Sequence, residues 1–222
     1  MARKKLKDAG PEARAGRVVS LLKEAYPEAT CALVHDGPFQ LLVATILSAQ
    51  CTDARVNMVT PELFRRFPDA AALAAADRAD VEEVVRSTGF FRAKAKNLQE
   101  MAAALLADHG GEVPRDLDAL TALPGVGRKT ANVVLGTAFG LATGVVVDTH
   151  VKRLAFRLGL TTRLAPEQVE RDLMAIVPRE EWVDLSHRLI QLGRRSCLAR
   201  KPRCSTCPMI AHCPRAGVTS SA

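Results

Sequence analysis

The stretch Leu123-Pro124-Gly125-Val126-Gly127-Arg128-Lys129-Thr130 joins two helical patterns, over residues 117–123 and 128–139. Its two glycines stand two positions apart, so the backbone can turn sharply and approach a ligand closely. The helix that follows begins with N–H groups that have no partner within the helix, which favours phosphate. The G-x-x-x-x-G-K-[ST] spacing of a nucleotide-binding P-loop is absent. The stretch therefore predicts either an ordinary turn between helices or a phosphate-binding hairpin.

Arg128 and Lys129 are two cations in the first turn of that helix. The positive end of the helix macrodipole disfavours cations there, and a residue that breaks such a local rule indicates function. Both cations could hold a phosphate. Alternatively, Lys129 could be kept partly uncharged for nucleophilic attack, because the helix terminus and Arg128 both disfavour its charged form.

Asp148 follows an apolar segment and precedes another helical pattern, so it is predicted to be a helix N-cap. A carboxylate near Lys129 would favour the charged amine and would not activate it. If Asp148 is catalytic, its role is therefore to stabilise a developing positive charge or to move a proton.

Helical patterns follow one another outward from the hairpin along almost the whole chain. Alanine and leucine are frequent and aromatic residues make up only 4% of the chain, a composition that favours helix over sheet. The best strand candidate, Val145-Val146-Val147, is too short to make a sheet. The sequence predicts an all-α fold with helices over residues 11–26, 39–48, 92–109, 117–123, 128–139 and 181–195. Further helices are expected to begin at Pro61 and Pro166, and N-caps are expected at Thr52 or Asp53, Asp69, Asp77, Asp80 and Asp148.

Four of the six cysteines stand close together in the spacing C-x6-C-x2-C-x5-C, namely Cys197, Cys204, Cys207 and Cys213. No apolar segment is long enough to span a membrane and no secretory signal is present, so disulfides are not expected. The clustered thiols then indicate a metal site, either zinc or an iron–sulfur cluster, which the spacing alone does not separate. Cys31 and Cys51 are expected to be core residues.

The chain carries 31 lysine and arginine residues against 24 aspartate and glutamate residues, a formal net charge of +7. This excess is compatible with a polyanionic partner without proving one. Arg200, Lys201 and Arg203 lie in the first loop between the clustered cysteines. A metal would hold this loop in one shape and make it an efficient phosphate contact. The alternative is a loop that is merely solvated.

The hairpin, the aspartate and the cysteine cluster together resemble the endonuclease III family, DNA glycosylases with an associated lyase activity. The resemblance extends from about Pro11 to Arg215 and is specific because the three features occur together. The matching stretches are Leu47-Ser48-Ala49-Gln50, Gly89-Phe90-Phe91-Arg92-Ala93-Lys94-Ala95, Leu123 to Asn132, Val147-Asp148-Thr149-His150 and the four cysteines.

This resemblance implies two α-helical domains. A six-helix barrel with a helix-hairpin-helix motif would comprise residues 30–142, and an iron–sulfur domain would comprise residues 11–29 and 143–215. Residues 1–10 and 216–222 would be flexible tails. The resemblance also implies that the metal group is a [4Fe-4S] cluster held by Cys197, Cys204, Cys207 and Cys213.

For the site, the resemblance implies that Lys129 and Asp148 are the catalytic pair and that the turn from Leu123 to Gly127 binds phosphate. Gln50 and Phe90 match positions that fill the gap left by an extruded base. In the family, the position of Phe90 often carries an aliphatic residue. The residues implied to contact DNA are Gln50, Phe90, Leu123, Gly125, Val126, Gly127, Arg128, His150, Arg200, Lys201 and Arg203.

The implied function is base excision repair. The enzyme would remove oxidised pyrimidines from double-stranded DNA and cleave the abasic site by β-elimination through a Schiff base on Lys129. It is expected to be a monomer in the cytoplasm, with the nucleoid and away from membranes. One alternative is an adenine-mismatch glycosylase, which differs at the position of Lys129 and generally carries an added C-terminal domain. Another is a non-catalytic DNA-binding or redox-sensing iron–sulfur protein, which has no use for Lys129 with Asp148.

Overall fold

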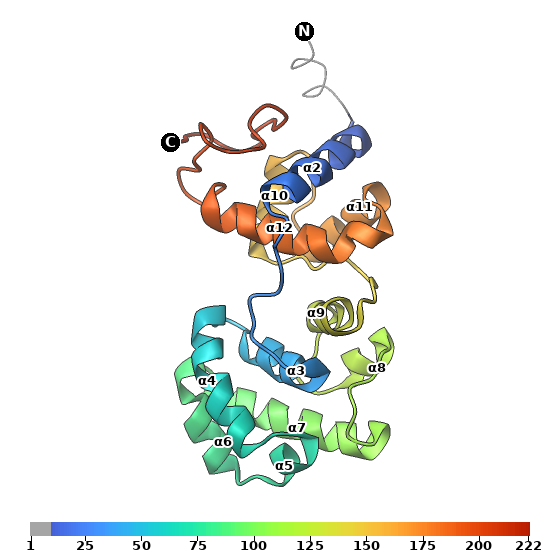
Figure 1. Ribbon diagram of the computed structural model, residues 1–222, viewed down its shortest axis with the longest axis vertical. Helices are drawn as coiled ribbons and strands as arrows, with labels where there is room; N and C mark the ends of the chain where they lie inside the picture. Colours follow the sequence, from blue (N-terminus) through green and yellow to red (C-terminus); the bar gives the residue numbers. More distant parts are fainter. Residues whose placement is uncertain (1–9) are drawn as a thin grey trace. The chain divides into compact units, whose positions relative to one another are not determined.

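The computed structural model describes residues 10–222, and all regular secondary structure in that range is helical (Figure 1). The predicted all-α fold is confirmed. Val145-Val146-Val147 forms no strand; Val145 and Val147 are buried in the segment that leads to Asp148.

The helices form two compact units with separate apolar cores. One unit comprises residues 31–143, and the other combines the described residues up to Thr30 with residues 144–222. The chain therefore leaves the second unit after its first described helix and re-enters it at Gly144.

The unit of residues 31–143 is built around helix α3. Its residues from Leu41 to Leu47 are all buried, because α4, α7 and α9 pack around it. Helix α7 also packs against α5 and α6, and buries Leu98, Met101 and Leu105. Full burial of one such side chain stabilises the fold by about 1.5–3 kcal/mol. The helices of this unit are α3 (Gly37–Leu47), α4 (Asp53–Arg66), α5 (Ala70–Ala75), α6 (Arg78–Val85), the short 3₁₀ helix η1 (Arg86–Thr88), α7 (Phe91–His109), α8 (Leu117–Ala122) and α9 (Arg128–Phe139).

The second unit packs its last long helix, α12, against α2 and α10. Leu22, Leu154 and Leu189 from these three helices are fully buried in one core. The irregular segment after α12 contains the clustered cysteines and lies against the same core through Met209. The helices of this unit are α2 (Pro11–Ala25), α10 (Thr149–Arg157), α11 (Pro166–Ile176), the 3₁₀ helix η2 (Arg179–Glu181) and α12 (Trp182–Arg195).

Side-chain caps begin several of the helices, and all of them except Asp116 are predicted from the sequence. In each case an oxygen of the cap accepts a hydrogen bond from a backbone N–H of the first turn, which satisfies a group that has no partner within the helix. These caps are Thr52, Asp69, Asp77, Asp116 and Asp148.

Two sequence predictions about helix starts are wrong. Pro61 does not begin a helix but lies inside α4. The missing N–H is tolerated because Val56, Val59 and Leu63 form one buried face on both sides of it. Asp80 is not a cap either; it lies in the first turn of α6 and pairs with Arg66 at 3.0 Å.

The C-terminal residues 216–222 do not form the free tail that we expected. The Ala216 N–H donates to the Arg157 carbonyl at 3.2 Å, and the Ala222 N–H donates to the Pro202 carbonyl at 2.9 Å. These bonds fix the segment against the end of α10 and against the cysteine-bearing loop. The expected N-terminal tail, residues 1–10, falls almost entirely outside the described residues.

The hairpin between α8 and α9 turns at Gly125. The Val126 N–H donates to the Leu123 carbonyl at 3.1 Å, and both of these side chains are buried in the core. Gly125 has φ +75°, and a Cβ added there would lie 2.9 Å from the Asn97 Cβ of α7. Gly127 has φ −90°, and nothing lies within 4 Å of its added Cβ. Only the first glycine is therefore required by the fold.

We predict that Gly125→Ala lowers the free energy of unfolding by about 1–3 kcal/mol, through backbone strain and the clash with Asn97. The matched control, Gly127→Ala, should change it by less than about 1 kcal/mol. Urea denaturation followed by circular dichroism measures both values. Equal effects of the two substitutions would contradict this account of the turn.

Candidate functional site

Lys129 lies at an exposed helix N-terminus that no side chain caps. The N-cap of α9 is Gly127, its first turn holds no acidic residue, and Arg128 and Lys129 are exposed. The opposite face of the helix is anchored by the buried residues Ala131 and Leu135. The start of α9 therefore combines outward-directed N–H groups with two cations, which is a favourable arrangement for phosphate.

The hairpin residues divide into buried and exposed positions. Leu123 and Val126 are only 4% and 6% exposed, so their side chains belong to the core and only their backbone groups are available to a ligand. Gly125, Gly127 and Arg128 are exposed. The family resemblance implies that all five residues contact DNA. The structure buries the side chains of Leu123 and Val126 and exposes the other three residues.

Gln50 and Phe90 are exposed residues on left-handed backbone, with φ of 53° and 48°. This conformation costs a residue other than glycine about 1–3 kcal/mol and persists only where the surroundings impose it. Phe90 is 67% exposed, which is unusual for a phenylalanine. The next residue, Phe91, packs against the core instead, with the Arg86 and Arg92 guanidinium groups near its ring.

Lys94 is a buried charge that the sequence analysis did not single out as a site residue. It is 5% exposed, and its Nζ donates hydrogen bonds to the Leu47 and Thr88 carbonyl oxygens, both at 2.8 Å. Burial lowers the pKa of Lys94, and the neighbouring Cys51 thiol opposes this change. The available signal was its place on α7, where Ala95 and Leu98 belong to the buried face.

Asp148 is half-buried and caps α10 through its Oδ1, which accepts a hydrogen bond from the Val151 N–H at 2.7 Å. The predicted cap is confirmed. Arg153 lies on the same helix, and burial lowers its pKa, while Cys197 and Asp148 act in the opposite direction. The Nη2 of Arg153 donates to the Cys197 carbonyl at 3.0 Å. Asp148 is thus linked to the cysteine-bearing segment through a single helix.

His150 is packed between α10 and α12. A Cβ added at Gly193 would lie 2.5 Å from its Nδ1, so α12 approaches His150 closely only because residue 193 is a glycine. The Arg153 Nη2 lies 3.2 Å from the same ring nitrogen. His150, which the family resemblance implies to contact DNA, is therefore half-buried, and its ring contacts residues of its own unit.

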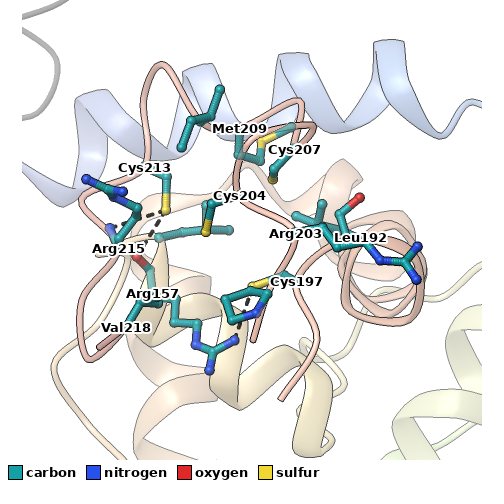
Figure 2. A pocket seen from close by; sticks show the side chains of 14 residues that line it. Arg157, Leu192, Cys197, Arg203, Cys204, Cys207, Met209, Cys213, Arg215 and Val218 are labelled. Atoms are coloured by element: carbon teal, nitrogen blue, oxygen red, sulfur yellow. Dashed lines mark hydrogen bonds between the residues drawn. The ribbon is translucent and has the colours of Figure 1, made fainter. Parts of the chain in front are cut away.

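The four clustered cysteines line one pocket of the second unit (Figure 2). Figure 2 shows their sulfur atoms directed toward a common space that Leu192, Met209 and Val218 also line. All six cysteines of the chain are free thiols, and Cys31 and Cys51 pack against the core of residues 31–143, as expected.

Neighbouring groups donate hydrogen bonds to two of these sulfur atoms. The Arg157 Nη1 lies 3.5 Å from the Cys197 Sγ, and the Arg215 N–H donates to the Cys213 Sγ at 3.3 Å (Figure 2). Arg157 also donates to the Leu198 and Ala199 carbonyls, which fixes the start of the loop.

Burial raises the pKa of Cys207 to about 11 and also raises the pKa of Cys213, and the neighbouring thiols act in the same direction. Four thiolates gathered here therefore need a bound cationic group to stabilise them. Over residues 10–222, no three histidine, cysteine, aspartate or glutamate side chains converge in a geometry for a single metal ion.

Arg200, Lys201 and Arg203 are exposed on the first loop between the cysteines. The Arg203 N–H donates to the Ser196 carbonyl at 2.9 Å, and Lys201 has φ 45°. The loop therefore presents its cations to solvent. No helix within residues 10–222 is long and apolar enough to cross a membrane.

The candidate residues are divided between the two units. Gln50, Phe90 and Lys129 belong to residues 31–143. In the same unit, Lys94 bonds to the chain segments that precede Gln50 and Phe90. Asp148 and His150 belong to the second unit with the cysteines and the basic loop.

Comparison with known proteins gives concordant results. The family model described as "HhH-GPD superfamily base excision DNA repair protein" matches residues 43–179. Endonuclease III of Synechocystis sp. is 54% identical over 210 residues, which cover 95% of this chain and 96% of that protein.

Solved structures of endonuclease III with DNA are also similar. A non-covalent complex aligns with a TM-score of 0.87 at 44% identity, over 92% of this chain and 95% of that one. A trapped covalent intermediate aligns with a TM-score of 0.84 at 45% identity, over 89% of this chain and 92% of that one. The family model matches more than half of the chain, and the relative from Synechocystis is similar over nearly all of it. The chain therefore belongs to the HhH-GPD superfamily of base excision DNA repair proteins and, within it, to the endonuclease III family.

Proposed function

We propose that this base excision repair protein is a bifunctional DNA glycosylase, which removes oxidised pyrimidines from double-stranded DNA and then cleaves the abasic site. The observation that carries the proposal is the exposed Lys129 at the uncapped N-terminus of α9, directly after the hairpin. A similar endonuclease III has been trapped as a covalent intermediate with DNA, which supports an enzyme nucleophile in the reaction.

In this mechanism the Lys129 Nζ attacks C1′ of the extruded nucleotide. The bond between C1′ and the base breaks, and the base leaves with the bonding electrons and takes up a proton. The sugar ring then opens to give a Schiff base between Nζ and C1′. Loss of a proton from C2′ expels the 3′ phosphate and cleaves the strand.

The other site residues hold the DNA and stabilise charge. The backbone N–H groups at the start of α9 and the exposed Arg128 would bind a phosphate near the lesion. Asp148 would stabilise the positive charge that develops on the sugar as the base departs. Gln50 and Phe90 would fill the gap left by the extruded nucleotide. Arg200, Lys201 and Arg203 would contact phosphates of the DNA backbone.

We further propose that residues 31–143 are the helix-hairpin-helix barrel and that the second unit is an iron–sulfur domain. Cys197, Cys204, Cys207 and Cys213 would hold a [4Fe-4S] cluster, and the donor set fits, because the four sulfur atoms face one pocket. The cluster would neutralise the thiolates and hold the basic loop in shape. The protein would act as a monomer in the cytoplasm, with the nucleoid.

We predict that Lys129→Ala abolishes both borohydride trapping and strand cleavage on lesion-containing duplex DNA, because no amine remains to form the Schiff base. Binding to the same DNA should stay within about threefold, since the hairpin backbone is unchanged. The control is Lys96→Ala, which removes an exposed lysine of α7 that pairs only weakly with Glu100 at 3.8 Å. Trapping that persists in Lys129→Ala would move the nucleophile to another residue.

Asp148→Asn should slow single-turnover base release by roughly 10²–10⁴-fold, while the melting temperature stays close to that of the unmodified protein. The asparagine keeps the capping oxygen but loses the negative charge. Asp116→Asn is the matched control, because Asp116 caps α8 in the same way and has no assigned role in the chemistry. A lowered melting temperature with near-normal base release would make Asp148 a structural cap only.

We expect the purified protein to be brown and to contain roughly four iron and four sulfide ions per chain. Cys204→Ala should lower the iron content and weaken the fold of the second unit, because ligation and folding are coupled. Cys31→Ala should leave the iron content unchanged. Stoichiometric zinc without sulfide, after anaerobic purification, would contradict the assignment.

A further inference from the structure

The Lys94 ammonium connects two loops that are distant in sequence. One acceptor, the Leu47 carbonyl, belongs to the last residue of α3, three positions before Gln50. The other acceptor, the Thr88 carbonyl, belongs to the last residue of η1, two positions before Phe90. Both N···O distances are 2.8 Å, so one buried cation sets the separation between the two chain segments.

Each of these segments is also fixed locally. The Ser48 hydroxyl donates to the Thr45 carbonyl at 2.8 Å, and the Thr88 hydroxyl donates to the Val85 carbonyl at 2.7 Å. Local bonds of this kind set the shape of each loop, but not the separation between the loops. That separation depends on a group that reaches both, as the Lys94 Nζ does.

Gln50 and Phe90 are the exposed, left-handed residues that these two segments present. Strained backbone persists only where surrounding contacts impose it, and the strain is concentrated at functional positions. Because Nζ bonds to a carbonyl three residues before Gln50 and to another two residues before Phe90, it is placed to support the two conformations together.

We propose that Lys94 is a positioning residue that holds Gln50 and Phe90 at the separation needed to enter the DNA base stack together. This inference rests on the proposed function, in which these two residues fill the gap left by an extruded nucleotide. Lys94 is buried beneath the loops with its ammonium bonded to two backbone carbonyls, so the side chain is not exposed for contact with DNA or the reacting atoms. Its contribution therefore concerns the opening of stacked base pairs and not the chemistry at C1′.

The test compares two substrates that differ only in stacking around the lesion. One is an oxidised pyrimidine in a fully paired duplex, and the other is the same lesion inside a short bubble of unpaired bases. Lys94→Met keeps the length of the side chain and removes the ammonium. The matched control is Lys96→Met, which changes an exposed lysine two positions further along α7.

We expect Lys94→Met to slow single-turnover base release from the paired duplex by about 10- to 100-fold, as a small misplacement of positioning groups does. Base release from the bubble should stay within about threefold, and Lys96→Met should resemble the unmodified protein on both substrates. Equal loss on the two substrates would show a general structural role and overturn the proposal, as would no loss on either.

If Lys94→Met does not fold, Lys94→Gln provides the test, because its amide keeps a donor for one of the two carbonyls. It should show the same selective loss on the paired duplex, and an unchanged ratio between the two substrates would overturn the proposal. A failure of the proposed function is distinguishable, because the unmodified protein would then release no base from either substrate.

Discussion

The Gly125 backbone approaches Asn97 so closely that this contact fixes the hairpin against α7. Asn97 lies on α7, the helix that begins after Phe90 and also carries Lys94. Lys94 and Asn97 are three residues apart and so share one face of α7, and Phe90 is the N-cap of the same helix. One helix therefore supports the hairpin and both exposed loops, and the three features proposed to contact DNA have a common, rigid reference.

Helix α10 has a comparable role in the second unit. Asp148 caps its first turn, and Arg153 and Arg157 extend from its later turns to Cys197 and the residues that follow. The proposed charge-stabilising carboxylate and the proposed cluster-binding loop are thus fixed to opposite ends of a single short helix.

The features predicted from the sequence are those with local causes. Caps and helix-breaking residues act on their immediate neighbours, so the starts at Pro11 and Pro166, the cap at Asp148 and the hairpin were predictable from the chain alone. The spacing of the cysteines predicted their convergence for the same reason. Other features depend on contacts between residues that are distant in sequence, and a local pattern does not contain this information. These features are Pro61 within α4, Asp80 paired with Arg66, Lys94 between two carbonyls, His150 against Gly193, and residues 216–222 bound to the cysteine-bearing segment.

The discontinuity of the second unit determines the order in which the chain can fold during synthesis. All residues of the unit 31–143 are available for folding once Thr143 has emerged from the ribosome. The core of this unit contains no residue from outside that range. Helix α2 is made before residues 31–143 but buries its apolar face against helices that are made after them, so its packing must wait for almost the whole chain. Until α12 emerges, the apolar residues of α2 lack the helices that they pack against in the folded unit, so completion of that unit is a late step.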